Sequence, residues 1–230
     1  MASDLPPSKS RGIVSAGRRA AMKALLAIDT AGMLGDDLFD QVSTREALDL
    51  RDRAFMVELV RGVLRYRATL DWRLGLLSDR RITKLPTLVQ TILRLGAYQL
   101  LYLDRVPDSA AVNESVQMTK QQSRRLGRDW SGFVNAVLRA LLRSPEPAWP
   151  DAGSDPVVAL AVRYSCPAWL VERWCRRLGA ERAEVLCRAS VEVPPLTLRV
   201  NTLRTSRAAL SADLAAAQVE AGPTSISEVG

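Results

Sequence analysis

Residues 86–107, PTLVQTILRLGAYQLLYLDRVP, form the segment around which the rest of this chain is expected to fold. Between its prolines, apolar side chains would occupy almost every side of a helix: Leu88, Val89, Ile92, Leu93, Leu95, Ala97, Leu100, Leu101 and Leu103. The polar residues Gln90, Arg94 and Gln99 form no continuous stripe, which argues against a peripheral helix with one wide apolar face. A membrane span needs about 20 uninterrupted apolar residues. The segment therefore predicts the central helix of a soluble helical domain.

Amphipathic patterns predict further helices on both sides of this segment. Apolar residues recur at spacings of three and four over residues 15–30, 50–69, 70–77 and 130–143, and another helix is expected to start at Asp108 or Ser109 and end in the basic loop 121–128. Residues 36–50 are expected to be irregular, with one helical turn at most. The fold class is therefore mainly α.

Residues 144–156, SPEPAWPDAGSDP, contain four prolines and a glycine, so no helix can pass through them intact. We expect a disordered basic arm at 1–14, a helical domain at 15–144, a linker at 145–156 and a further region at 157–230. That region should contain helices at 157–164, 168–178 and 181–191, a strand at 196–200 and a helix at 206–219. A single strand cannot complete a sheet. We therefore expect the start of an incomplete α/β domain and read the chain as a fragment.

The positive charge of the chain is unevenly distributed. The formal net charge is +7; residues 1–150 hold 23 Lys and Arg against 16 Asp and Glu, whereas residues 151–230 hold 9 of each. This excess makes the first part the candidate for binding a polyanion. Only four of the 32 basic residues are lysines. Arginine suits bidentate contacts to phosphate, although genome composition is an alternative source of this bias.

Two groups of basic residues are the candidate RNA contacts. The first is the arm and the start of the helix at 15–30, and the second is the loop 121–128. Together they comprise Arg11, Arg18, Arg19, Lys23, Arg124, Arg125 and Arg128. A flexible basic arm that leads into a basic helix suits contacts along a phosphate backbone. An ordinary solvated polar face is the alternative interpretation.

The sequence lacks the residues that several kinds of catalytic and metal-binding site require. Histidine is absent, which removes the commonest general base and metal ligand. Cys166, Cys175 and Cys187 form no C-x-x-C pair, so we expect reduced core thiols rather than disulfides or a zinc site. No two glycines are spaced as G-x-G, and the phosphate-loop spacing of Gly12 and Gly17 lacks the required Lys and Ser or Thr. The N-terminus has no apolar run typical of a secretory signal, which predicts a cytoplasmic protein.

Several motifs resemble known families. VPDSAAVNESV at 106–116 and SGFVNAVLR at 131–139 resemble the NusB-like domain, an all-helical RNA-binding fold, and RDRAF at 51–55 and VRGVLR at 60–65 are similar to its methyltransferase-fused version. SCPAWLVERW at 165–174 and PPLTLRVNTL at 194–203 resemble the segment before the catalytic domain in the Sun/RsmB family of 16S rRNA cytosine-5 methyltransferases. Cys166 stands where that family often has a histidine. Asn113, Glu114 and Asn135 belong to the motif and would either fix loop ends or contact RNA.

The resemblance implies an N-terminal, RNA-binding, substrate-recognition portion of an rRNA methyltransferase. It implies S-adenosylmethionine for the full-length family, structured RNA such as ribosomal RNA as the partner, and a downstream methyltransferase domain in cis. The family's glycine-rich cofactor turn and catalytic cysteine motif do not occur in the sequence. We therefore expect no catalytic, cofactor-binding or metal-binding residue in this chain, and no activity from it alone.

Two alternatives come from other functional classes. A free-standing NusB-like antitermination or transcription-regulation factor would bind RNA and a ribosomal protein, but it would have no use for residues 151–230. A protein-interaction module would use the helical bundle for partner docking without contacting RNA. Salt-sensitive RNA affinity would distinguish the RNA-binding readings from this last one.

Overall fold

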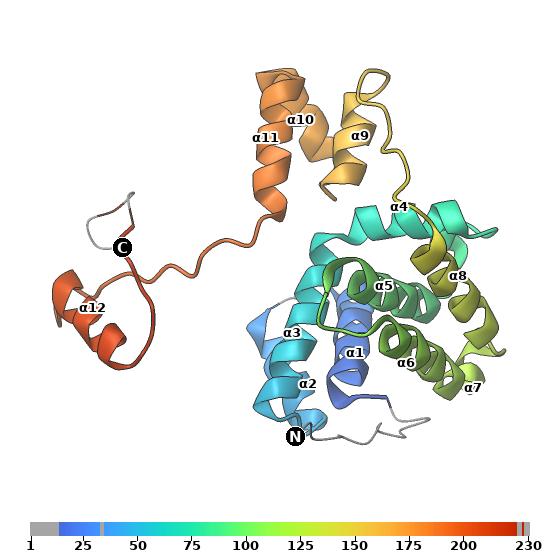
Figure 1. Cartoon of the computed structure of the whole chain (residues 1–230), viewed down its shortest axis with the longest axis horizontal. Coiled ribbons are helices and arrows are strands. Elements are labelled where there is room, and N and C mark those ends of the chain that lie inside the picture. The colour runs from blue at the N-terminus through green and yellow to red at the C-terminus, as the bar shows by residue number, and fades with distance from the viewer. Residues whose placement is uncertain (1–13, 33–34, 225–226, 228–230) are drawn as a thin grey trace, which may run out of the picture. The chain divides into compact units, whose positions relative to one another are not determined.

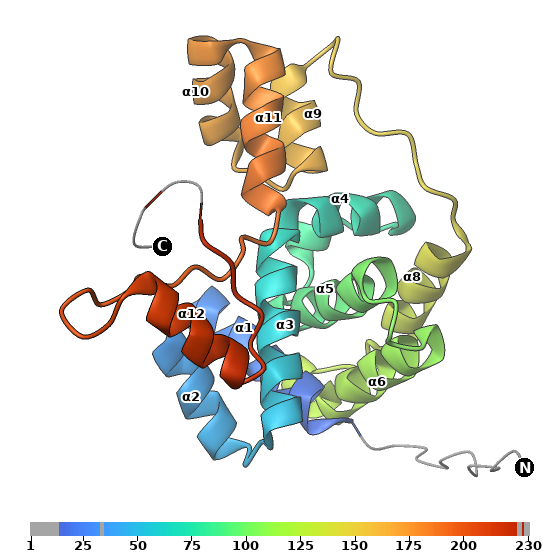
Figure 2. The same ribbon diagram turned by 60° about the vertical axis from the view of Figure 1, so that its left-hand side comes forward.

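The computed structural model describes residues 14–32, 35–224 and 227, and a helical bundle accounts for most of them. The central helix is α5 (Thr87–Tyr102). Around it lie α1 (Ala16–Ala31), α2 (Asp36–Arg45), α3 (Leu50–Arg65), α4 (Arg67–Leu77), α6 (Asp108–Gln121), α7 (Ser123–Leu126), α8 (Ser131–Arg143) and the 3-10 helix η1 (Ile82–Lys84). The helix α5 contacts α1, α3, α4, α6 and α8, as Figures 1 and 2 show. Its Val89, Ile92 and Leu93 are completely buried, which confirms the predicted central helix.

The structure corrects two expectations for the first half of the bundle. Residues 36–45 form a full helix, α2, rather than one turn, because Leu38, Phe39 and Val42 are buried in the bundle core and stabilise it through tertiary packing. The helix expected at 50–69 ends at Arg65, and α4 starts at Arg67 after a break at Tyr66. The Asp49 carboxylate starts α3 by accepting a hydrogen bond from the amide of Asp52 at 2.7 Å.

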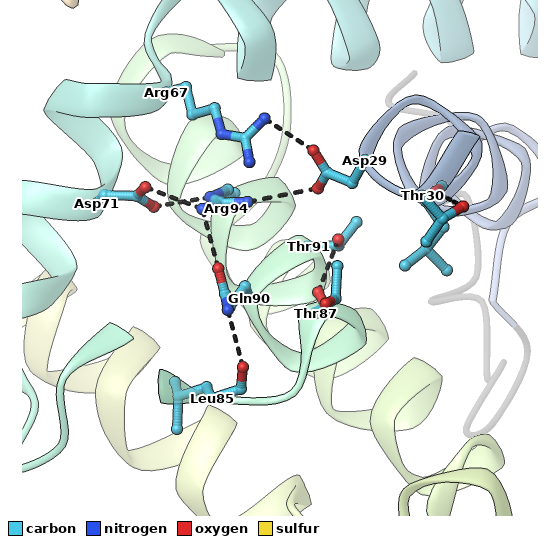
Figure 3. A network of polar contacts seen from close by, with 10 residues as sticks. Asp29, Thr30, Arg67, Asp71, Leu85, Thr87, Gln90, Thr91 and Arg94 are labelled. Atoms are coloured by element: carbon cyan, nitrogen blue, oxygen red, sulfur yellow. Dashed lines mark hydrogen bonds and ion pairs between the residues drawn. The ribbon is translucent and has the colours of Figure 1, made fainter. Parts of the chain in front are cut away.

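A buried ionic network joins α1, α4 and α5. Arg94 of α5, whose side chain is 4% exposed, donates two hydrogen bonds to Asp71 of α4 at 2.7 and 2.9 Å and lies 3.6 Å from Asp29 of α1. Arg67 also pairs with Asp29, and Gln90 accepts a third hydrogen bond from Arg94 (Figure 3). The polar interruption at position 94 is therefore a satisfied core arginine.

Three further helices follow the proline-rich linker: α9 (Pro156–Arg163), α10 (Ala168–Leu178) and α11 (Ala180–Val191). They share a small apolar core of their own, formed by Leu160, Tyr164, Cys166, Val171, Ala183 and Cys187. Helix α9 contacts α4. The Thr69 hydroxyl donates to the Val162 carbonyl at 2.6 Å, the Ser165 hydroxyl accepts from the Ala68 amide at 2.8 Å, and Trp149 of the linker stacks on Trp72. These three helices thus form one compact unit with the bundle, which extends to Val191.

Residues 192–230 form a second unit. It contains α12 (Arg207–Ala216), which begins where the Ser206 hydroxyl accepts a hydrogen bond from the Ala209 amide at 3.2 Å. The strand predicted at 196–200 is not formed, and the described residues contain no strand at all. The alternating pattern is present, but a strand needs a neighbouring strand for its backbone hydrogen bonds, and none is available among these residues.

Candidate nucleic-acid interface

The start of α1 lies beside a hollow on the bundle surface, which we call the α1 hollow. Its volume is about 590 Å³, and its lining comes from the first turns of α1, α3 and α6: Ser15, Arg18, Asp49, Arg51, Asp52, Phe55, Arg105, Val106, Pro107 and Ala110. Arg51 and Arg105 are exposed and have no ion-pair partner in the described part of the chain. The amides at helix starts and these two guanidinium groups both favour an anion, whereas Asp49 and Asp52 oppose one.

Arg18 lies at the wall of this hollow but is committed to the interior. Its side chain is 9% exposed, its Nη1 pairs with Glu114 Oε1 at 2.8 Å, and its Nε donates to Gln99 Oε1 at 2.5 Å. Burial lowers the pKa of the Arg18 guanidinium below its ordinary value, and Glu114 acts in the opposite direction. The guanidinium also lies 5.1 Å from the Phe55 ring centre. The sequence suggested that Arg18 is free to contact phosphate. In the structure its guanidinium group is already engaged by Glu114, Gln99 and Phe55.

Glu114 fixes Ser15, the residue before α1, as well as Arg18. Its Oε2 accepts a hydrogen bond from the Ser15 amide at 2.8 Å. The Ser15 hydroxyl does not cap the helix through the backbone and instead accepts from Arg18 at 3.1 Å. Of the other motif residues, Asn135 accepts a hydrogen bond from Arg139, whereas Asn113 is exposed and has no hydrogen-bond partner among the described residues. Glu114 therefore has a structural role, while Asn113 faces solvent.

Arg19 and Lys23 remain at the surface but share one carboxylate. Arg19 Nε lies 2.9 Å from Glu46 Oε2, and Lys23 pairs with Glu46 Oε1. Burial alone would raise the pKa of Glu46, but hydrogen bonds and charges from Lys23 and Arg19 lower it below its ordinary value of 4.5. The single carboxylate of Glu46 therefore compensates part of the charge of both cations when no ligand is bound. Arg11 lies outside the described residues.

The second predicted group has a different environment. Arg124, Arg125 and Arg128 are all exposed, and none of them has a carboxylate partner among the described residues. Helix α7 carries the first two, and Gly127, at φ +70°, reverses the chain before Arg128. Only glycine adopts this left-handed backbone without strain. Three unneutralised guanidinium groups therefore gather at the end of α6.

A polar row along α6 connects the α1 hollow with this second group. Asn113, Gln117 and Lys120 are spaced by four and three residues, which places them on one face of α6, and Arg124 follows on α7. None of the four forms an ion pair or a side-chain hydrogen bond with other described residues. Helix α6 has 14 residues, so the row spans roughly 20 Å between the two basic ends. A long anionic ligand fits this arrangement better than a small one.

Sequence reasoning missed Arg51 and Arg105 as candidates and the pairing of Arg18. Helical spacing carries the signal for Arg18, since it lies four residues before Met22 and seven before Leu25, on the buried face of α1. No comparable signal identifies Arg51 or Arg105. The two residues line the same hollow only because α3 packs near the turn between α5 and α6. For these two residues the structure was required.

The described residues offer little to other chemistry. They contain no group of three or more His, Cys, Asp or Glu side chains that could hold a metal ion. Burial raises the pKa of Cys166, and it raises that of Cys187 to about 12, so both are protonated near neutral pH. Neither thiol suits a nucleophilic role. None of the helices in the described part of the chain combines the length and apolar character that a bilayer crossing demands.

Two family models match the chain. The NusB family model matches residues 15–143, which correspond to the bundle, and the model of the ferredoxin-like domain of RsmF/B-like methyltransferases matches residues 166–230. The crystal structure of PH0851 matches 94% of this chain and 48% of its own chain, with a TM-score of 0.63 and 17% sequence identity. At this identity the likeness concerns the fold alone.

Curated relatives share sequence over most of the chain. A probable ribosomal RNA small subunit methyltransferase B from Bacillus subtilis is 35% identical over 203 residues, which are 88% of this chain and 44% of the relative. The protein of the same name from Synechocystis is 36% identical and covers 86% and 44%. The ribosomal RNA small subunit methyltransferase B of Pseudomonas putida is 33% identical and covers 93% and 46%. The chain thus spans less than half the length of these relatives.

Proposed function

We propose a function from the premise that this chain belongs to the NusB family: it is the RNA-binding, substrate-recognition portion of an rRNA methyltransferase. The bundle would bind structured ribosomal RNA, and the part of the relatives beyond this chain would carry methyl transfer from S-adenosylmethionine to a cytosine. The names of the relatives and the ferredoxin-like match at 166–230 support this assignment over a free-standing antitermination factor. We place the protein in the cytoplasm, where ribosomal RNA is made and modified in bacteria.

The observation that carries the RNA-binding proposal is the unneutralised charge at both ends of α6. Arg124, Arg125 and Arg128 at one end, and Arg51 and Arg105 at the other, are exposed and have no carboxylate partner among the described residues. Polar uncharged side chains and Lys120 lie between the two groups on one face of α6, whereas the carboxylates of Asp49, Asp52, Asp104 and Asp108 lie at the α1 end. A polyanion that follows this face of α6 meets uncharged polar side chains and Lys120 before it reaches the arginines of the α7 end.

The individual residues would contribute unequally. Arg124, Arg125 and Arg128 can contact phosphate directly, whereas Arg19 and Lys23 would first have to release Glu46. Arg18 would act indirectly, by holding the start of α1. This ranking reverses the order expected from the sequence, which placed the arm and the start of α1 first and the loop 121–128 second.

Filter binding of a small-subunit rRNA fragment at several salt concentrations tests the proposal. Wild-type protein should bind with a steep decrease of log K against log salt, and Arg124→Ala with Arg125→Ala should reduce that slope by about two. Arg182→Ala, an exposed arginine on α11, serves as the matched control. Wild-type affinity that does not change with salt would contradict RNA binding through this surface.

A second measurement tests whether this chain binds RNA without catalysing methyl transfer. The 230-residue chain should bind the RNA but transfer no methyl group from S-adenosylmethionine. Transfer of radiolabelled methyl groups to RNA by this chain alone would contradict the assignment of catalysis to the remaining part of the relatives.

A further inference from the structure

Trp130 brings together two arginines that are far apart in the sequence. The guanidinium carbon of Arg128 lies 3.7 Å from the centre of the Trp130 ring, and that of Arg80 lies 5.7 Å from the same centre. Arg80 belongs to the turn between α4 and η1, whereas Arg128 follows α7. Since both distances are measured to the same ring centre, the two guanidinium carbons lie within about 9 Å of each other. This is about one Debye length at physiological salt.

Neither guanidinium has an acidic partner. Arg80 and Arg128 are exposed, and neither forms an ion pair within the described ranges. The neighbouring carboxylate of Asp129 is turned to the start of α8, where it accepts a hydrogen bond from the Ser131 amide at 2.8 Å, and this contact lowers its pKa. Two like charges at this distance repel each other, and a bound anion would relieve that repulsion.

The aromatic ring orders these side chains before a ligand binds. A guanidinium stacked on an indole face keeps its N–H edge free to donate two parallel hydrogen bonds. Trp130 is itself 7% exposed and packs edge-on against Phe133, so the platform is fixed. An arginine that is already oriented loses less side-chain entropy on binding than a free one.

The indole nitrogen supplies an independent observation. Trp130 Nε1 is the one buried side-chain nitrogen or oxygen, among the described residues, that has no hydrogen-bond partner. Buried donors are normally paired, and an unpaired one calls for an explanation such as a ligand or water. Because this nitrogen is out of contact with solvent, the exposed guanidinium groups of Arg80 and Arg128 are the donors that an anion can reach on Trp130.

We propose that Arg80 and Arg128, held on Trp130, form a phosphate-binding site for the backbone of an RNA strand. The inference rests on the proposed RNA-binding function and extends it, since it adds Arg80 and the Trp130 platform to the basic group at the end of α6. The exposed Arg81 on the same turn and Lys84 at the end of η1, together with Arg124 and Arg125 of α7, provide further positive charge near the two arginines in the sequence. The ligand class is the phosphodiester group, so the site contributes affinity without base selectivity.

The test measures RNA affinity against salt for Arg80→Ala, Arg128→Ala and the double variant, with Arg182→Ala as control. Each single variant should reduce the log-log slope by about one and the double variant by about two. Trp130→Phe keeps both charges, so it should weaken affinity severalfold while the slope stays unchanged. Thermal unfolding of each variant verifies that the bundle remains folded.

The outcomes separate this inference from the function on which it rests. If wild-type protein binds RNA with a steep salt dependence but Arg80→Ala behaves like Arg182→Ala, the Trp130 site is wrong and the proposed function stands. If wild-type protein shows no salt-sensitive RNA binding, the proposed function is wrong, and the Trp130 site that rests on it is wrong as well. Inorganic phosphate added at constant ionic strength should compete weakly; full displacement of RNA at low millimolar phosphate would indicate a small-anion site and overturn the proposal.

Discussion

The arginines at the start of α1 and those of α7 stand in opposite situations. At the α1 side, Arg18 is enclosed by Glu114 and Gln99, and Arg19 shares Glu46 with Lys23. At the α7 side, Arg124 and Arg125 have no partner among the described residues. The comparison shows that one residue type serves two purposes in this bundle. A carboxylate within reach makes an arginine part of the fold, and its absence leaves the charge available to a ligand.

The extreme of the first situation is Arg94, and its removal should have the largest effect. Arg94→Met would leave Asp71 without its cation and Asp29 with Arg67 alone, which should reduce the free energy of unfolding by about 3–5 kcal/mol. Urea unfolding followed by circular dichroism measures this change. The contrast is Arg124→Ala, which should stay within about 0.5 kcal/mol of wild type.

An equal effect of the two substitutions would remove the distinction between paired and unpaired arginines. A small loss for Arg94→Met alone would mean that apolar packing of the methionine replaces the network, as happens with some buried ion pairs. Arg94→Met combined with Asp71→Leu tests this explanation, because the double variant removes the stranded carboxylate and should recover part of the lost stability.

Arg18 provides the second prediction, intermediate in size. Arg18→Met should lower the free energy of unfolding by about 2–3 kcal/mol, since Glu114 is only 20% exposed and would lose its cation while Gln99 would lose a donor. Lys23→Ala, whose side chain is 51% exposed, should change it by less than about 1 kcal/mol. Loss of RNA affinity by Arg18→Met with unchanged stability would instead support direct phosphate contact.

The sequence predicted the central helix because apolar residues surround it, and this pattern depends little on neighbours. It could not predict α2, whose three buried apolar residues become informative only once the surrounding core is known. The strand at 196–200 failed for a related reason, since alternation describes one strand and pairing requires two. Within the candidate site, charge excess identified the basic groups, but the pairing that separates Arg18 from Arg124 depends on contacts between distant segments.

Glu46 allows a test of the weaker pairs by pH. Its pKa is lowered in the folded state, so its pairs with Lys23 and Arg19 stabilise the fold at neutral pH, and this contribution is lost as pH falls below about 4.5 through the folded-state value. Both cations are about half exposed, so the contribution should be about 0.5–1 kcal/mol. The difference in unfolding free energy between wild type and Glu46→Gln should therefore shrink between pH 6 and pH 3. A constant difference would contradict the pairing.

The same substitution gives the smallest and sharpest prediction, because it converts paired cations into unpaired ones without adding a charge to them. In Glu46→Gln, Arg19 and Lys23 no longer compete between a carboxylate and a phosphate, so RNA affinity at low salt should rise about threefold and the salt slope should steepen by up to about one. Glu172→Gln, which frees Arg176 on α10, is the matched control and should leave RNA affinity unchanged. If Glu46→Gln also left affinity unchanged, the α1 end would make no phosphate contact through these two residues. RNA recognition by the bundle would then depend on the arginines that have no partner from the start.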